Sequence, residues 1–128
     1  MSATRETTRA EYLLMMARDM KESVLVTRIV NHAVAMGWRV MHQRPAMERS
    51  GKWSTALQGH KGFPDLVLSA PAVGRVMFVE CKSHTGSLEP EQKAWRDTLL
   101  AAGADWRLWR PMDWLGGDIQ NVIERVED

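Results

Sequence analysis

The sequence predicts an α/β domain in which helices flank a central mixed β-sheet. Helical and strand-like patterns alternate along the chain, in the order two helices, strand, loop, two strands, helix, strand and helix. The 128 residues suffice for one hydrophobic core but not for two. Hydrophobic residues make up 45% and charged residues 26%, a globular composition that excludes a disordered tail and a collagen-like fibre.

Two helices are predicted first. Residues 8–19 and 21–36 contain good helix formers without Gly or Pro, and Gly37 is a natural end for the second helix. Glu22 lies on the same face of that helix as apolar residues four, seven and eleven positions later. Its carboxylate therefore lies at the N-terminal end of the core-facing stripe, where a carboxylate is unusual.

The predicted centre of the sheet follows. Residues 38–42 alternate like a strand, and the next 20 residues, 43–62, mix Pro, Gly, Ser and cations as in a loop with room for a short hairpin. Residues 64–69 and 75–82 are apolar runs joined by a short segment with Pro and Gly. Such a joint suits an antiparallel hairpin.

The C-terminal part predicts a helix over residues 90–102, a strand over residues 105–110 and a helix over residues 118–126. Glu89 precedes the first of these helices, where a capping Ser or Thr is usual. Ser87 is therefore an alternative start for that helix.

Cys81 is the single cysteine, which excludes an intramolecular disulfide and a Cys-based zinc cage. We therefore expect a reducing compartment, the cytoplasm. There is no uninterrupted apolar run of about 18 residues and no apolar segment behind a basic N-terminus, so we expect neither a membrane span nor secretion.

Charge is unevenly distributed along the chain. The formal net charge of +1 does not indicate a polyanionic partner. However, residues 43–62 have a local charge of +3, and the segment from Pro111 to the end has −4. A basic loop of this kind is either a solvated segment or a phosphate-binding surface, and charge alone leaves both open.

Acidic residues of the predicted hairpin suggest a metal site. Glu80 and Lys82 project from the same face of the strand because side chains alternate, and Val79 and Cys81 point into the core. Strand pairing brings Asp65 near Glu80, and a bound divalent cation relieves the repulsion of two carboxylates. These oxygen ligands suit Mg²⁺ or Mn²⁺. The alternative is that Glu80 and Lys82 form an ordinary ion pair.

These residue types are also what phosphodiester hydrolysis requires. The reaction needs a metal that polarises the phosphoryl oxygen and activates water, and a cation that stabilises developing negative charge. Asp65 and Glu80 are candidate metal ligands, and Lys82 is the candidate cation.

Several separated motifs accompany this triad of residues. They are Gly51-Lys52-Trp53, Gly59, Gly62-Phe63-Pro64-Asp65-Leu66, Glu80-Cys81-Lys82, Pro90-Glu91-Gln92 with Trp95, and Trp109-Arg110-Pro111. Together they resemble the VRR-NUC family, the virus-type replication and repair nucleases of the PD-(D/E)XK superfamily. The resemblance implies a restriction-endonuclease-like core in residues 20–128. Residues 1–19 remain as an N-terminal helical extension.

The resemblance also implies the residues of the active site. The implied set, with Mg²⁺ or Mn²⁺ as cofactor, is Glu22, Asp65, Glu80, the backbone carbonyl of Cys81, the catalytic lysine Lys82, and Gln92. Gln92 shares a helix face with Trp95 and Leu99, so packing of those two would aim its amide at the metal. Its alternative role is a reciprocal helix cap, and one side chain can do both.

A phosphodiester substrate gives the basic loop a purpose. The candidate DNA-binding residues are Arg44, Arg49, Lys52, His60 and Lys61. Trp53 either stacks on an unpaired base or is structural. The resemblance implies a homodimer that cleaves branched DNA in phage-type replication or repair, in the host cytoplasm. Residues 1–19 are the candidate dimer contact.

Two other functions remain open at this stage. The chain is either a non-catalytic accessory protein that binds branched DNA, or an interaction protein whose acidic segment, residues 113–128, binds a basic partner. Cleavage of DNA distinguishes the nuclease from both.

Overall fold

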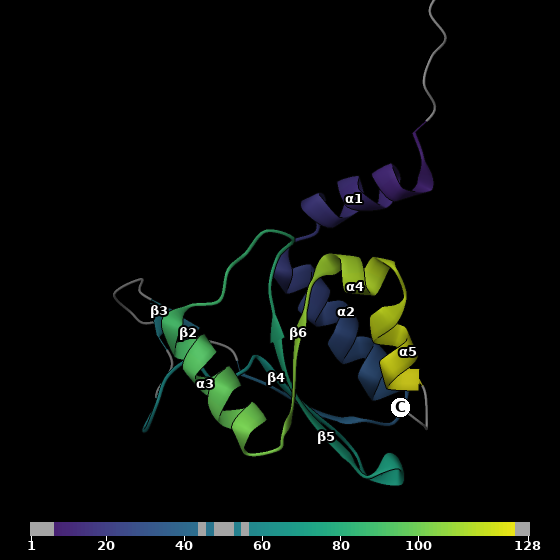
Figure 1. Cartoon of the computed structure of the whole chain (residues 1–128). Coiled ribbons are helices and arrows are strands. Elements are labelled where there is room, and N and C mark those ends of the chain that lie inside the picture. The colour runs from purple at the N-terminus through teal and green to yellow at the C-terminus, as the bar shows by residue number, and fades with distance from the viewer. Residues whose placement is uncertain (1–6, 44–45, 48–52, 55–56, 125–128) are drawn as a thin grey trace, which may run out of the picture.

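A four-stranded mixed sheet forms the centre of the computed structural model, which describes residues 7–43, 46–47, 53–54 and 57–124 (Figure 1). Its strands, in spatial order, are β1 (Arg39–His42), β4 (Leu66–Ala70), β5 (Arg75–Cys81) and β6 (Asp105–Trp109). The first three strands pair antiparallel, and β5 and β6 pair parallel. The prediction of a mixed sheet is confirmed.

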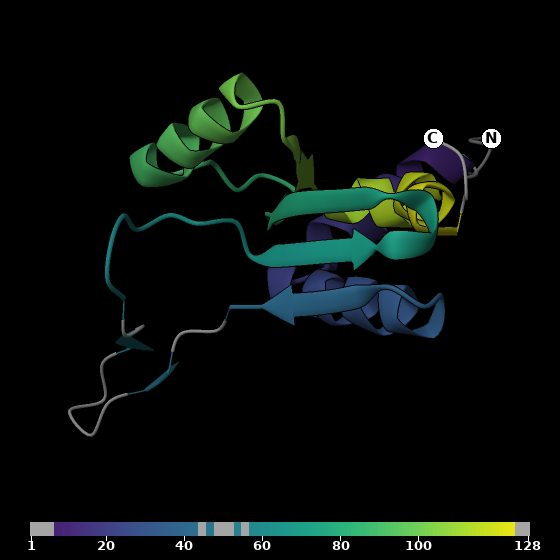
Figure 2. The same cartoon turned by 90° about the horizontal axis from the view of Figure 1, so that it is seen from below.

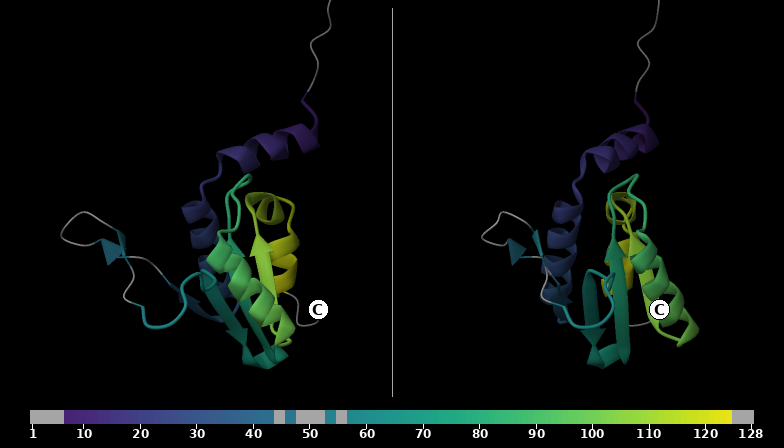
Figure 3. Two further views of the ribbon diagram at one scale, coloured as in Figure 1. Left: turned by 60° about the vertical axis from the view of Figure 1, so that its left-hand side comes forward. Right: turned by 90° about the vertical axis from the view of Figure 1, so that its left-hand side faces the viewer.

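Helices cover both faces of this sheet, as Figures 1 and 3 show. Helices α2 (Glu22–Ala35) and α5 (Asp118–Glu124) pack on one face, and α3 (Pro90–Ala101) lies on the other. Helix α1 (Arg9–Asp19) precedes α2 and packs against the short helix α4 (Pro111–Leu115). No helix in the described part of the chain is long and apolar enough to cross a membrane.

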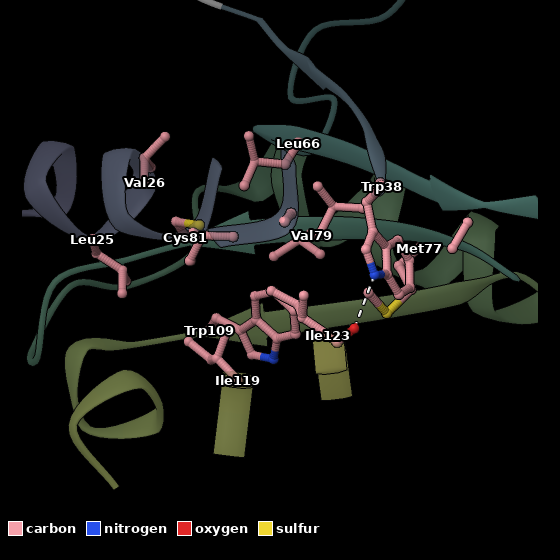
Figure 4. Close-up of a cluster of buried hydrophobic side chains, with 14 residues drawn as sticks. Leu25, Val26, Trp38, Leu66, Met77, Val79, Cys81, Trp109, Ile119 and Ile123 are labelled. Carbon is pink, nitrogen blue, oxygen red and sulfur yellow. Dashed lines mark hydrogen bonds between the residues drawn. The ribbon is translucent and has the colours of Figure 1, made fainter. Parts of the chain in front are cut away.

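The hydrophobic core lies between the sheet and helices α2 and α5 (Figure 4). Its buried side chains include Leu25, Val26, Ile29, Ala33, Trp38, Leu66, Leu68, Met77, Val79, Cys81, Trp109, Ile119 and Ile123. Alternate residues of β4 and β5 contribute to it, as the period of two requires. The indole Nε1 of Trp38 donates a hydrogen bond of 2.9 Å to the carbonyl of Ile123, which ties the end of α2 to α5.

The β4–β5 hairpin sets the register that brings Asp65 level with Glu80. A 3₁₀ turn over Pro71–Val73 joins the strands, and Gly74 closes it with φ +62°, a left-handed conformation that favours glycine. Leu66 pairs with Val79, so Asp65 lies at the level of Glu80. The predicted hairpin and its pairing are confirmed.

Three short elements, β2 (Ala46–Met47), β3 (Trp53–Ser54) and α4, lie in segments for which the sequence predicts a loop or the end of a strand. Strand β2 pairs with β3, which confirms the short hairpin in the basic loop, and Figure 2 shows this ribbon apart from the main sheet. Helix α4 was not predicted, because Pro111 was interpreted only as the end of a strand. Proline also suits the first position of a helix, and Pro111 occupies it.

The alternative start of α3 at Ser87 is wrong. The helix begins at Pro90 with Glu89 as the N-cap residue, and the backbone N–H of Glu89 donates a hydrogen bond of 2.8 Å to Oε1 of Gln92. A reciprocal bond from the third helical residue therefore sets the start where a capping Ser or Thr is missing.

We predict that Ile29→Ala lowers the free energy of unfolding by about 2–5 kcal/mol, because Ile29 is 0% exposed and its loss leaves a cavity beneath the sheet. Val34→Ala on the same helix is the matched control, since Val34 is 57% exposed. Urea unfolding should detect a change of about 0.5 kcal/mol or less for this control. Equal effects of the two substitutions would contradict the described core.

Candidate active site

The two predicted metal-binding carboxylates lie side by side where β4 begins and β5 ends. Oδ2 of Asp65 accepts a hydrogen bond of 2.8 Å from the backbone N–H of Cys81. The side chain of Glu80 is 1% exposed and is hydrogen-bonded to the Asp65 carboxylate. The hairpin register therefore produces the acid pair that the sequence predicts.

This environment changes the protonation of Glu80. Burial, followed by the charge of Asp65 and its hydrogen bond, raises the pKa of Glu80 to about 9, while the charge of Lys82 opposes the shift. Two carboxyl groups in contact cannot both be ionised without a compensating charge. Without a cation, Glu80 therefore carries a proton at neutral pH.

Gln92 forms the predicted reciprocal cap of α3 and also contacts Glu80. Its Nε2 donates a hydrogen bond of 3.0 Å to Oε1 of Glu80, and its Oε1 accepts the bond from the backbone N–H of Glu89. A backbone N–H can only donate, so the second bond fixes which end of the amide faces Glu80. The start of α3 thus orients the carboxyl group of Glu80.

Glu22 and Lys82 lie within electrostatic range of the acid pair. Glu22 is the first residue of α2, and its side chain is exposed at that end of the helix. Partial desolvation and then the charge of Asp65 raise the pKa of Glu22, and the ammonium of Lys82 lowers it. Lys82 follows β5, and its backbone N–H donates to the carbonyl of Trp109 at 3.1 Å.

The oxygen donors present fit a hard divalent cation. Within the described part of the chain, no three His, Cys, Asp or Glu side chains form a ready-made metal-binding group. Two carboxylates and a carbonyl nevertheless suit Mg²⁺ or Mn²⁺, which commonly retain water ligands. Burial and the nearby acids raise the pKa of the Cys81 thiol well above its usual value, so the thiol stays neutral and only its carbonyl is a plausible donor.

A glycine allows the loop before Asp65 to pack on α3. Gly62 has φ +89°, and a Cβ placed on it would lie 2.5 Å from the backbone carbon of Glu91. Phe63 then packs edge-on against Phe78 and Trp95, with ring centroids 5.9 and 5.0 Å away. Any larger residue at position 62 would push this loop, and with it Asp65, away from α3.

The predicted DNA-binding residues are only partly described. His60 and Lys61 are exposed, and they line a hollow of about 470 Å³ against Glu91 and Trp95 of α3. None of the predicted metal-site residues lines this hollow. Arg44, Arg49 and Lys52 lie outside the described residues, as does the side chain of Trp53.

Two acids of the C-terminal segment make contacts inside the fold. Oδ2 of Asp113 accepts a hydrogen bond of 2.7 Å from the backbone N–H of Arg110, and Oε2 of Glu124 lies 3.1 Å from Nε2 of His32. Asp113 and Glu124 are therefore engaged within the domain, whereas the interaction-protein hypothesis assigns the acidic segment to binding of a basic partner.

The sequence suggested no role for Arg110. Its Nη1 donates hydrogen bonds of 2.8, 3.4 and 2.7 Å to the carbonyls of Ser83, His84 and Gly86, in the loop after Lys82. The available signal was its place at the end of the strand that pairs with β5. The position of Arg110 indicates a contact with the loop after Lys82 only when the parallel pairing of β5 and β6 is known.

Comparisons with known proteins bear on the family and the fold of the chain. A sequence profile of the VRR-NUC domain matches residues 6–110. A solved structure described as "VRR_NUC domain" has a TM-score of 0.58 and 20% identity, over 83% of this chain and 97% of that chain, which supports a PD-(D/E)XK-like α/β core. A comparison with curated proteins gives no match. Because the profile covers most of the sequence, the chain belongs to the VRR-NUC family of nuclease domains.

Proposed function

We propose that this VRR-NUC domain is a Mg²⁺- or Mn²⁺-dependent endonuclease that hydrolyses DNA phosphodiester bonds. The observation that supports it most is the contact between the Asp65 and Glu80 carboxyl groups within range of Lys82. A pair of acids of which one, Glu80, is fully buried costs free energy, and a purely structural role would be filled better by apolar or amide side chains. A cation-binding function explains why the pair is present.

In this proposal Asp65, Glu80 and the carbonyl of Cys81 hold the cation, and Glu22 adds negative charge nearby. The bound cation would neutralise phosphate charge and acidify water. Gln92 orients Glu80, and the backbone N–H of Cys81 orients Asp65. The water oxygen would form a bond to phosphorus as the bond to the leaving oxygen breaks, with the water losing one proton to solvent and the leaving oxygen taking one from solvent.

Lys82 has a separate role in the proposed reaction. Its ammonium lies within electrostatic range of Glu80 and Glu22, on the strand end that also carries the acid pair. A fixed positive charge at this place stabilises the negative charge that develops on the phosphoryl group. Lys82 is therefore the proposed catalytic lysine.

We propose branched or junction DNA as the substrate and a homodimer as the active form. Residues 43–62 carry a charge of +3, and contacts with phosphates position DNA without reading its sequence. The division into a helical extension, residues 1–19, and a nuclease domain, residues 20–128, belongs to this proposal. Tyr12 and Met15 of α1 are each 52% exposed, which supports a dimer contact there.

The first experiment incubates the purified protein with labelled four-way junction, flap, splayed, duplex and single-stranded DNA, with Mn²⁺, Mg²⁺ or EDTA. We expect cleavage that requires the metal and is faster on branched DNA than on duplex. Binding of branched DNA with no cleavage at any metal concentration would favour the accessory-protein hypothesis instead.

Lys82→Ala should slow cleavage by about 10²-fold or more, because it removes the fixed charge beside the reacting phosphate. DNA binding, measured by fluorescence anisotropy, should be retained. Lys93→Ala is the control, since Lys93 is exposed on α3. Full activity of the Lys82 variant would refute the assigned mechanism.

In the metal-free fold Glu80 keeps its proton up to about pH 9, whereas an ordinary glutamate loses it near 4.5. The folded state thus binds more protons between these values, so stability falls as pH rises through this window. Glu80→Gln should remove that loss, a gain on the order of 1–3 kcal/mol at pH 8.

Thermal unfolding with and without Mn²⁺ measures both effects. We expect Mn²⁺ to raise the Tm of the wild type and to leave that of Glu80→Gln unchanged, because the variant lacks a ligand. Asp97→Asn on α3, where the side chain is exposed, controls for the loss of one negative charge. If Glu80→Gln behaves like the wild type in both respects, Glu80 is not the buried, metal-binding acid.

A further inference from the structure

Arg110 leaves the sheet directly beside the proposed catalytic lysine. Trp109, the last residue of β6, pairs with Cys81, and its carbonyl accepts the backbone N–H of Lys82 at 3.1 Å. The backbone N–H of Arg110 donates to Asp113 at the start of α4. The main chain at Arg110 is therefore fixed on both sides.

The guanidinium of Arg110 binds the loop that follows Lys82. Nη1 lies 2.8 Å from the carbonyl oxygen of Ser83 and 2.7 Å from that of Gly86, with His84 at 3.4 Å. A cationic donor strengthens hydrogen bonds to carbonyl oxygens. One side chain thus holds both ends of a polar four-residue loop.

That loop lies against the stem of Lys82. The backbone N–H of Gly86 donates to the carbonyl of Ser83 at 3.3 Å, which closes the turn. A Cβ placed on Gly86 would lie 3.5 Å from Cδ of Lys82. The loop therefore lies close to the stem of Lys82, and a displaced loop would change the space open to that side chain.

We propose that Arg110 is a positioning residue for Lys82. By holding the Ser83–Gly86 loop against the lysine stem, it keeps the ammonium beside Asp65 and Glu80. A lysine side chain is otherwise flexible, and this ordering is needed before its charge acts at one place. The inference rests on the proposed function of Lys82, and Arg110 itself contacts neither substrate nor cation.

The test compares Arg110→Ala and Arg110→Lys with the wild type on branched DNA and Mn²⁺. We expect Arg110→Ala to lower kcat by about 10–100-fold with little change in KM, because misplacement of a catalytic group acts on the chemical step. Arg110→Lys should recover part of the loss, and added guanidinium ion should raise the rate of Arg110→Ala but not of the wild type. Arg107→Ala is the matched control, since Arg107 on β6 pairs with Asp105.

An unchanged kcat in Arg110→Ala would overturn the inference. A raised KM at constant kcat would also overturn it, because that result would indicate a contact with phosphate. So would a loss of activity that equals the fraction of unfolded protein and that added guanidinium ion does not restore. NMR signals of the Lys82 methylenes, assigned with Lys82→Ala, give a readout that needs no activity. We expect them to be ordered in the wild type and averaged in Arg110→Ala, and equal mobility in both would also refute the inference.

If the wild type cleaves no DNA, the proposed function fails, and the NMR comparison alone still decides whether Arg110 orders Lys82. The two failures are therefore distinguishable.

Discussion

Two carboxyl groups held in contact inside a protein cost free energy, and the fold around Asp65 and Glu80 offsets that cost with hydrogen bonds. The backbone N–H of Cys81 donates to Asp65, and the amide of Gln92 donates to Glu80. Each donor comes from a different element, β5 and α3. The acid pair is therefore stable only if the β4–β5 hairpin is paired in this register and α3 is packed where Gln92 reaches Glu80.

The sheet makes such a pair possible because its two faces differ. Cys81 and Val79 are buried in the core against α2 and α5, whereas Glu80 between them turns toward α3. A slip of one residue in β5 would place a carboxylate in the apolar core and an apolar side chain beside Asp65. Burial of the core therefore fixes the register of the site. The favourable free energy of apolar burial is large, and it offsets the smaller free-energy cost of holding the two acids together.

Local patterns were enough to predict most of the fold and the proximity of Asp65 and Glu80. The hairpin brings Asp65 to Glu80 because the two strands that carry them are neighbours in the sequence. Gln92 is at the start of the next helix, so its contacts with Glu89 and Glu80 also join residues that are close in the sequence. Helix α4 was missed because Pro111 suits both the end of a strand and the start of a helix. Arg110 could not be assigned, because its contacts depend on the parallel pairing of β5 with β6, which no short-range pattern specifies.

The same electrostatics constrain how DNA can approach. With the site free of cations, Asp65 and Glu22 present negative charge at the place where the proposed function puts a phosphate, and Lys82 offsets it only in part. On the proposed function, a divalent cation reverses the sign of this local field, and a bound phosphate in turn favours the cation. Linkage makes the two affinities raise each other by the same factor. The near-neutral whole chain is therefore compatible with a nuclease, because the charge that matters is local and depends on the cation.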